Sequence, residues 1–169
     1  MPAAAPPDDR FTVRIQAEDF DTAAEVAALS AGRVDIGAVV TFSGLCRADD
    51  AGDSAPNGSR LVALTLEHYP GMAEEEIRRL VDEARARWPL LGATVIHRHG
   101  RIVPGENIVL VVTASPHRGA AFDAAAFLMD WLKTRAPFWK LEERAEARSW
   151  VAAKEADDAA AERWTAGTP

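Results

Sequence analysis

Two helical segments that each stop at a proline are the strongest constraint on how this sequence folds. Within 71–88, apolar residues recur three and four positions apart and so share one helical face: Ile77, Leu80, Val81, Ala84 and Trp88. Within 119–134, the same spacing predicts a buried face of Phe122, Ala125, Ala126, Met129 and Leu132. Because proline cannot continue a helix, Pro89 and Pro137 limit where the two helices end. The strands are therefore expected in the segments around them.

Short apolar runs flank these helices and predict the strands of the fold. They cover 11–15, 36–42, 61–67, 93–97, 108–113, 138–141 and 149–151. A shorter helix is expected after Asp19 or Asp21 as its cap, and a last one within 153–164. Several consecutive strands have no helix between them to make a parallel crossover, so the sequence predicts an α+β fold.

The length and charge of the chain narrow the class of protein. Its 169 residues suit one domain, which we place at 11–164 between flexible ends at 1–10 and 165–169. A net charge of −7 argues against a nucleic-acid binder. No apolar run approaches the roughly 18 residues of a spanning helix, and the N-terminus lacks the pattern of a secretory signal, so we expect a cytoplasmic protein. The loop at 48–59 is predicted to be mobile.

The histidines and the cysteine leave chemical alternatives open. His97 and His99 would point to the same face of a strand, where they either bind a metal ion or are ordinary strand-end residues. A metal-dependent hydrolase that uses them with His117 is one alternative function. Cys46 is the only cysteine, which excludes intrachain disulfides and cysteine-based zinc clusters. Beside Arg47, it is either a nucleophilic thiolate or a passive thiol.

Basic residues gather around the second helix although the chain as a whole is acidic. Within 113–141 there are four basic and two acidic side chains. The segment 115–119 ends a strand and opens the helix, where free N–H groups and Arg118 suit a phosphate; a capped helix start with a surface arginine is the alternative. Lys133 and Lys140 are either solvated cations or lysines in a partly dry pocket, where a lowered pKa would allow base or nucleophilic chemistry.

Six segments of the chain match, in order and spacing, the motifs of one known family. They are 37–44 with Arg47, 64–72, 95–98, 115–118, 132–140 and 150–151. The block Lys-Thr-Arg-Ala-Pro-Phe-Trp-Lys at 133–140 is highly specific. Together these segments resemble the large, catalytic subunit of molybdopterin synthase over roughly residues 11–164.

The resemblance implies a sulfurtransferase of molybdenum cofactor biosynthesis. Such enzymes convert cyclic pyranopterin monophosphate into molybdopterin by inserting two dithiolene sulfurs. The sulfur arrives as a thiocarboxylate on the C-terminal Gly-Gly of a small ubiquitin-like carrier subunit, so no bound cofactor or metal is implied. The family fold is an α/β hammerhead with an added antiparallel β subdomain. It forms a homodimer with one carrier at each end, which makes a heterotetramer.

The resemblance also assigns site residues. It matches Lys133 and Lys140 to the two catalytic lysines, and Arg47, His117 and Arg118 to the groups that hold the pterin and its phosphate. It further implies an apolar pocket wall of Phe42 and Met129, and a basic position near the anion at Lys154. The remaining implied pocket residues are Leu45, Cys46, Leu141 and Glu142.

Helix geometry adds a constraint of its own. Arg118 and Lys133 lie 15 residues apart on the second predicted helix, which separates them by about 22 Å at roughly 1.5 Å per residue. One small substrate cannot touch both, so a shared pocket needs His117 and Arg118 from one protomer and Lys133 and Lys140 from another. A non-catalytic anion-binding scaffold that docks a ubiquitin-like partner remains an alternative, but a scaffold has no need of both lysines beside an anion site. An inactive paralogue is a further alternative, which the intact matched positions disfavour.

Overall fold

The computed structural model describes residues 10–48, 60–145, 147–151 and 155–165. The loop predicted over 48–59 lies outside these residues except for Ala48. The ends that we predicted to be flexible also lie outside them, apart from Arg10 and Thr165. No helix within the described residues is long and apolar enough to cross a membrane.

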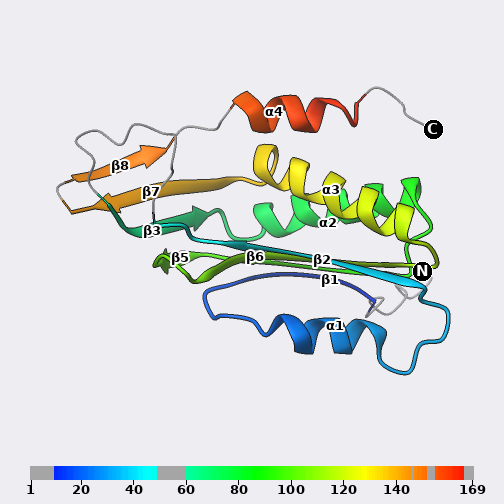
Figure 1. Cartoon of the computed structure of the whole chain (residues 1–169). Helices are drawn as coiled ribbons and strands as arrows, with labels where there is room; N and C mark the ends of the chain where they lie inside the picture. The colour runs from blue at the N-terminus through cyan, green and yellow to red at the C-terminus, as the bar shows by residue number, and fades with distance from the viewer. Residues whose placement is uncertain (1–9, 49–59, 146, 152–154, 166–169) are drawn as a thin grey trace, which may run out of the picture.

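The described residues form two four-stranded sheets, one of which forms the centre of the molecule (Figure 1). Its strands are β1 (Phe11–Gln16), β4 (Gly92–Arg98), β6 (Asn107–Ser115) and β2 (Ala38–Leu45), in that spatial order. β1 runs parallel to β4, whereas β4 with β6 and β6 with β2 are antiparallel. β2 is therefore an edge strand, with Ala38 opposite Ser115 at one end and Leu45 opposite Asn107 at the other.

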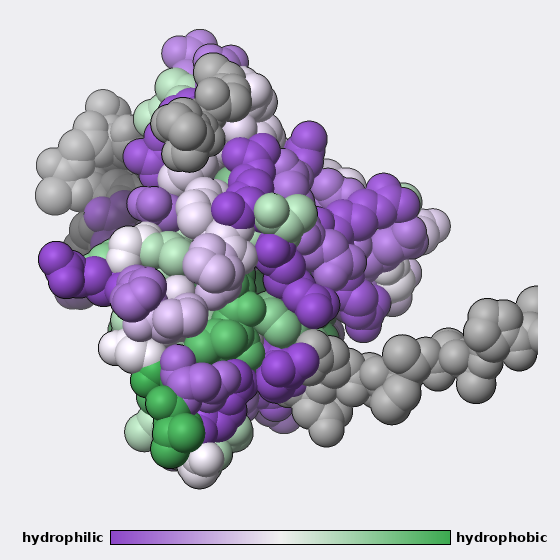
Figure 2. All heavy atoms as spheres, turned by 90° about the vertical axis from the view of Figure 1, so that its right-hand side faces the viewer, coloured by the Kyte–Doolittle hydropathy of each residue, from purple (hydrophilic) through white to green (hydrophobic). Residues whose placement is uncertain are grey.

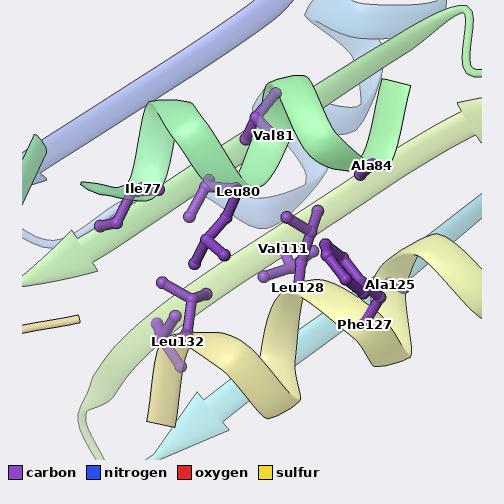
Figure 3. Close-up of a cluster of buried hydrophobic side chains, with 11 residues drawn as sticks. Ile77, Leu80, Val81, Ala84, Val111, Ala125, Phe127, Leu128 and Leu132 are labelled. Carbon is purple, nitrogen blue, oxygen red and sulfur yellow. The ribbon is translucent and has the colours of Figure 1, made fainter. Parts of the chain in front are cut away.

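Two helices cover one face of this sheet and a third covers the other (Figure 1). α2 (Met72–Arg87) and α3 (Arg118–Thr134) bury their apolar faces against β4 and β6, and Leu80, Leu128 and Val111 meet there with Phe127 (Figure 3). α1 (Thr22–Ser30) packs on the opposite face around Leu29. The central sheet is thus covered on both faces, as its nearly continuous apolar strands require.

The helix ends follow the predicted signals. Asp21 caps α1 by accepting a hydrogen bond from the Ala24 N–H at 3.1 Å. Gly71 precedes α2 with a positive φ of 85°, and its N–H donates to the Glu74 carboxylate at 2.7 Å. A side chain at that φ would be strained, so glycine suits the position. α2 then ends at Arg87, two residues before Pro89.

The buried face of α3 differs from the predicted one. Phe122, which we expected to be buried, is 59% exposed, and Ala126 and Met129 are only partly buried. The fully buried stripe instead consists of Ala121, Ala124, Ala125, Phe127, Leu128 and Leu132. The helix is turned so that its small residues approach the sheet closely, and Phe122 lies on the far side of that contact.

A second, entirely antiparallel sheet extends from one end of the central sheet (Figure 1). Its order is β5 (Gly100–Ile102), β3 (Leu61–His68), β7 (Phe138–Arg144) and β8 (Ala147–Val151). The described residues therefore form the predicted α+β fold with an added antiparallel β subdomain. β5 was missed, because three residues are too few to show an alternating pattern.

Ring stacking joins the two sheets. His97 of β4 lies flat on Phe138 of β7, with ring centroids 3.8 Å apart and planes inclined by 15°. His68 of β3 lies 5.8 Å from Phe138, and His99 lies 4.7 Å from His68. Burial, with the nearby Lys140 charge as a smaller cause, lowers the pKa of His97 to about 4. His97 is therefore neutral near pH 7.

The C-terminal helix α4 (Glu155–Glu162) packs along α3. Trp164, which follows it, inserts its ring edge-on between Trp88 and Phe127. The Trp164 indole N–H donates to Asp130 at 2.7 Å, and Arg87 donates to the Trp164 carbonyl at 2.9 Å. These contacts attach the end of the chain to the helix that carries the site described below.

The contrast between Phe127 and Phe122 gives a stability prediction. Phe127→Ala should lower the free energy of unfolding by about 3–5 kcal/mol, because it leaves a cavity in the core between α2, α3 and the sheet. Phe122→Ala, on the same helix but exposed, should lower it by no more than about 0.5 kcal/mol. Urea unfolding at one protein concentration measures both, and equal losses would contradict the observed rotation of α3.

His97 gives a prediction for the pH dependence of stability. Its folded pKa of about 4 lies below the unfolded value of about 6.5, so between these values only the unfolded chain takes up a proton. Stability should therefore fall as the pH falls from about 6.5 to about 4, by up to ~1.4 kcal/mol per pH unit from this group. His97→Phe should remove that part of the slope, and identical slopes for the two proteins would contradict the assignment.

Candidate functional site

The predicted site residues lie at opposite ends of α3. Arg118 is the first residue of this helix and Lys133 is the last but one, so the single helix predicted between them is confirmed. Their backbones are about 22 Å apart at roughly 1.5 Å per residue. The site therefore has two halves within one chain.

The first half, which we call the anion end, surrounds the start of α3. Gly37, Pro116, His117, Arg118 and Gly119 line a pocket there. The His117 N–H donates to Ser115 Oγ at 3.3 Å, and the first turn of α3 holds no acidic side chain. Open backbone N–H groups, the positive end of the helix dipole and a guanidinium together suit a phosphate.

Glycine is required at the wall of this pocket. The Gly37 N–H donates to the Ser115 carbonyl at 3.1 Å, and a Cβ at Gly37 would lie 2.1 Å from the Pro116 carbonyl oxygen. Any side chain at Gly37 would therefore displace the segment that leads into α3. Figure 2 views this end of the molecule, where an apolar strip lies between hydrophilic side chains.

The second half, which we call the lysine end, consists of Lys133, Lys140 and the strip 45–47. Lys133 is 52% exposed and donates to Asp157 of α4 at 3.3 Å. The connection 135–137 joins α3 to β7, so Lys133 and Lys140 flank one short turn. Lys140 is exposed, opposite Leu66 of β3 and Val151 of β8.

Cys46 packs the strip 45–47 against the second sheet. It is 3% exposed and clusters with Leu64, Leu66 and Ile102, and Leu66 is the register partner of Lys140. Burial, followed by the carboxylates of Glu106 and Glu142, raises the pKa of the Cys46 thiol. A buried thiol held protonated is a packing residue, so the structure favours the passive alternative over a nucleophile.

Arg47 lies far from the other two residues that the resemblance assigns to the phosphate. β2 begins beside the anion end, where Ala38 pairs with Ser115, and reaches the lysine end at Leu45. Its eight residues span about 24 Å at roughly 3.4 Å per residue. Within one chain the structure therefore separates Arg47 from His117 and Arg118, and groups it with the two lysines.

The remaining implied pocket residues also lie toward the lysine end. Leu45 is half exposed. Phe42 lies on the same face of β2 as Val40, and both Val40 and the partly buried Met129 pack against the core beside α3. Strand alternation places Glu142 on the same face of β7 as Lys140 and turns Leu141 to the opposite face. Lys154 lies outside the described residues.

The histidines of the alternative metal site do not come together within this chain. His97 pairs with Val109 of β6, six residues before Ser115, whereas His117 follows Ser115. His97 and His117 are thus about 20 Å apart at roughly 3.4 Å per residue. Among the described residues, no group of three or more His, Cys, Asp or Glu side chains is placed to hold a metal ion.

Sequence reasoning missed Asp157 as the ion-pair partner of Lys133. The first turn of α4 is acidic, with Glu155, Asp157 and Asp158, and that run was the available signal. It lies 24 residues from Lys133 along the chain, so only the packing of α4 on α3 reveals the pair.

Comparisons with known proteins agree with this architecture. The family model described as MoaE protein matches residues 15–135. The molybdopterin synthase catalytic subunit of Mesorhizobium japonicum is 65% identical over 155 residues, which are 90% of this chain and 92% of that protein.

Solved structures match as well. The molybdopterin biosynthesis MoaE protein of Burkholderia ambifaria superposes with a TM-score of 0.76 at 44% identity, over 92% of this chain and 99% of that one. A protein–protein complex of subunits 1 and 2 of the molybdopterin-converting factor from Helicobacter pylori matches with a TM-score of 0.66, over 85% of this chain and 90% of that one. Its identity of 21% shows a shared fold only. On the sequence matches and the shared architecture, the chain belongs to the MoaE protein family.

Proposed function

We propose that this chain is the catalytic subunit of a molybdopterin synthase and transfers sulfur to cyclic pyranopterin monophosphate to form the dithiolene of molybdopterin. The observation that carries the proposal is the placement of Lys133 and Lys140 on either side of one turn, with Arg47 at the same end of the molecule. The names of the relatives support the reaction, since a protein 65% identical over nine-tenths of this chain is called a molybdopterin synthase catalytic subunit.

The complete site is proposed to form between two copies of the chain. The phosphate would bind at the anion end of one protomer, and the pterin side chain would reach the lysine end of the other. The 22 Å between Arg118 and Lys133 supports this, because one chain cannot offer both ends to one small substrate. Among the described residues no strand pairs with the outer edge of β2, which carries the exposed Phe42 and Leu45, so a second copy can cover it.

The sulfur donor is proposed to be a thiocarboxylate on the C-terminal Gly-Gly of a small ubiquitin-like carrier. A two-glycine tail has no side chains to prevent a close approach, and the anionic thiocarboxylate is attracted by the cations at the lysine end. The complex of two subunits solved for Helicobacter pylori is consistent with such a partner.

Two protomers with two carriers would make a heterotetramer, and no resident cofactor is needed. We place the reaction in the cytoplasm, where both substrates would be made.

The two lysines are proposed to have different roles. In each transfer the thiocarboxylate sulfur forms a carbon–sulfur bond on the pterin side chain while a carbon–oxygen bond there breaks. Water then cleaves the acyl–sulfur bond, which leaves the sulfur on the pterin and the carrier C-terminus as a carboxylate. We assign proton transfer to Lys133 and stabilisation of developing negative charge to Lys140. Asp157 accepts a hydrogen bond from the Lys133 ammonium in this structure, so an arriving anion competes with Asp157 for it.

Lysine substitutions test the catalytic assignment. Lys133→Ala and Lys140→Ala should each slow dithiolene formation by about 100-fold or more, because each removes proton transfer or charge stabilisation in the transition state. Arg135→Ala is the matched control: it removes a cation from the same turn that stacks on Trp131 and pairs with Glu83, and it should keep near-normal activity. The assay uses purified protein, thiocarboxylated carrier and the pyranopterin precursor. If Lys133→Ala kept the wild-type rate, the proton-transfer role of Lys133 would be wrong.

Mixing inactive variants tests the shared site. Arg118→Ala and Lys133→Ala chains, mixed in equal amounts and allowed to exchange, should recover about a quarter of the wild-type activity, since half the dimers are mixed and each has one intact site. Mixing Lys133→Ala with Lys140→Ala should recover none, because each lysine end then carries one defect. Recovery in the second mixture, or its absence in the first, would argue against a site built from two chains.

A further inference from the structure

The ring stack between the two sheets includes Phe138, which lies on the same strand as Lys140. Phe138 begins β7 and lies two residues before Lys140, so the two side chains share a face of the strand. His97 covers one side of the Phe138 ring at 3.8 Å, and His68, the register partner of Phe138, lies 5.8 Å away. The start of β7 is therefore held against β3 by hydrogen bonds and against β4 by ring stacking.

The orientation of the His97 ring is itself fixed. Its Nδ1 lies 2.8 Å from the Arg98 carbonyl oxygen, which can only accept, so Nδ1 carries the proton and donates. The groups that face His97 are Lys140 of β7, His68 of β3 and the neighbouring His99. Burial first, and the Lys140 charge as a smaller cause, lower the pKa of His97 and keep it neutral near pH 7. A neutral ring beside an ammonium avoids the repulsion that a second cation would cause.

We propose that His97, stacked on Phe138, is a positioning residue that sets the location of the Lys140 ammonium in the reaction. This rests on the proposed role of Lys140. His97 makes no contact with the reacting atoms in this assignment; it fixes the first residue of β7, and the rigid strand transmits that position two residues along. Displacement of a catalytic group by about 1 Å is enough to slow a reaction by up to about 100-fold, so a well-held β7 matters for the rate more than for binding.

Three substitutions distinguish the effect of ring stacking from the effect of the imidazole group itself. His97→Ala removes the stack, Phe138→Leu keeps apolar volume but loses the flat ring, and His97→Phe restores a ring without a titratable group. We expect kcat to fall about tenfold or more in His97→Ala and Phe138→Leu, with the KM for carrier and for pterin precursor changed less than about twofold. His97→Phe should return kcat to within about twofold of wild type.

A core substitution elsewhere provides the control for lost stability. Val112 is fully buried in β6 among the residues that pack against α1, on the far face of the central sheet from α3. Val112→Ala should lower the melting temperature and leave kcat near wild type when assayed well below that temperature. If Val112→Ala lowers kcat as much as His97→Ala does, the effect is general loosening and the inference is overturned.

The remaining outcomes are also decisive. If Lys140→Ala is slow but His97→Ala and Phe138→Leu keep wild-type kcat, the positioning role is wrong while the proposed function stands. If Lys140→Ala keeps the wild-type rate, the proposed role of Lys140 fails, and the positioning role fails with it. A raised KM at unchanged kcat, or a His97→Phe enzyme as slow as His97→Ala, would also overturn the inference. If His97→Ala does not fold, Phe138→Leu decides alone.

Discussion

The unbroken helix α3 is the element on which the rest of the site depends. It carries Arg118 at its first position and Lys133 near its last, and its buried stripe along the central sheet includes Phe127 and Leu128. A packed helix of this kind cannot bend to bring its ends together, because bending would break both its hydrogen bonds and its core contacts. Within one chain, Arg118 and Lys133 therefore stay at opposite ends of α3, which is why the proposed site is built from two chains.

The two ends of α3 have environments suited to different tasks. At the anion end, Gly37 lets the backbone approach closely, and N–H groups and Arg118 meet there without a nearby acid in the first turn of the helix. Such surroundings suit a fixed negative charge. At the lysine end, Lys133 pairs with Asp157, and Lys140 lies opposite the buried Leu66 and close enough to lower the pKa of His97. Cations held in place in this way can stabilise negative charge that develops during a reaction.

The places where sequence reasoning failed have identifiable causes. Phe122 falls at helical spacing with true core residues, but small alanines allow α3 to approach the sheet along a neighbouring stripe. β5 is too short to carry a periodic pattern. The rotation of α3 is decided by contacts with residues distant along the chain.

The sequence by itself determined the class of fold, the ends of the helices and the chemistry available. These follow from local causes: proline and capping residues stop or start a helix within one turn, and the side-chain pattern has the period of its own element. The tertiary structure alone decided which groups meet, including Lys133 with Asp157, His97 with Phe138, and Cys46 with Leu66. The reason is that strand register and helix packing are set by contacts between distant segments, and no local pattern records them.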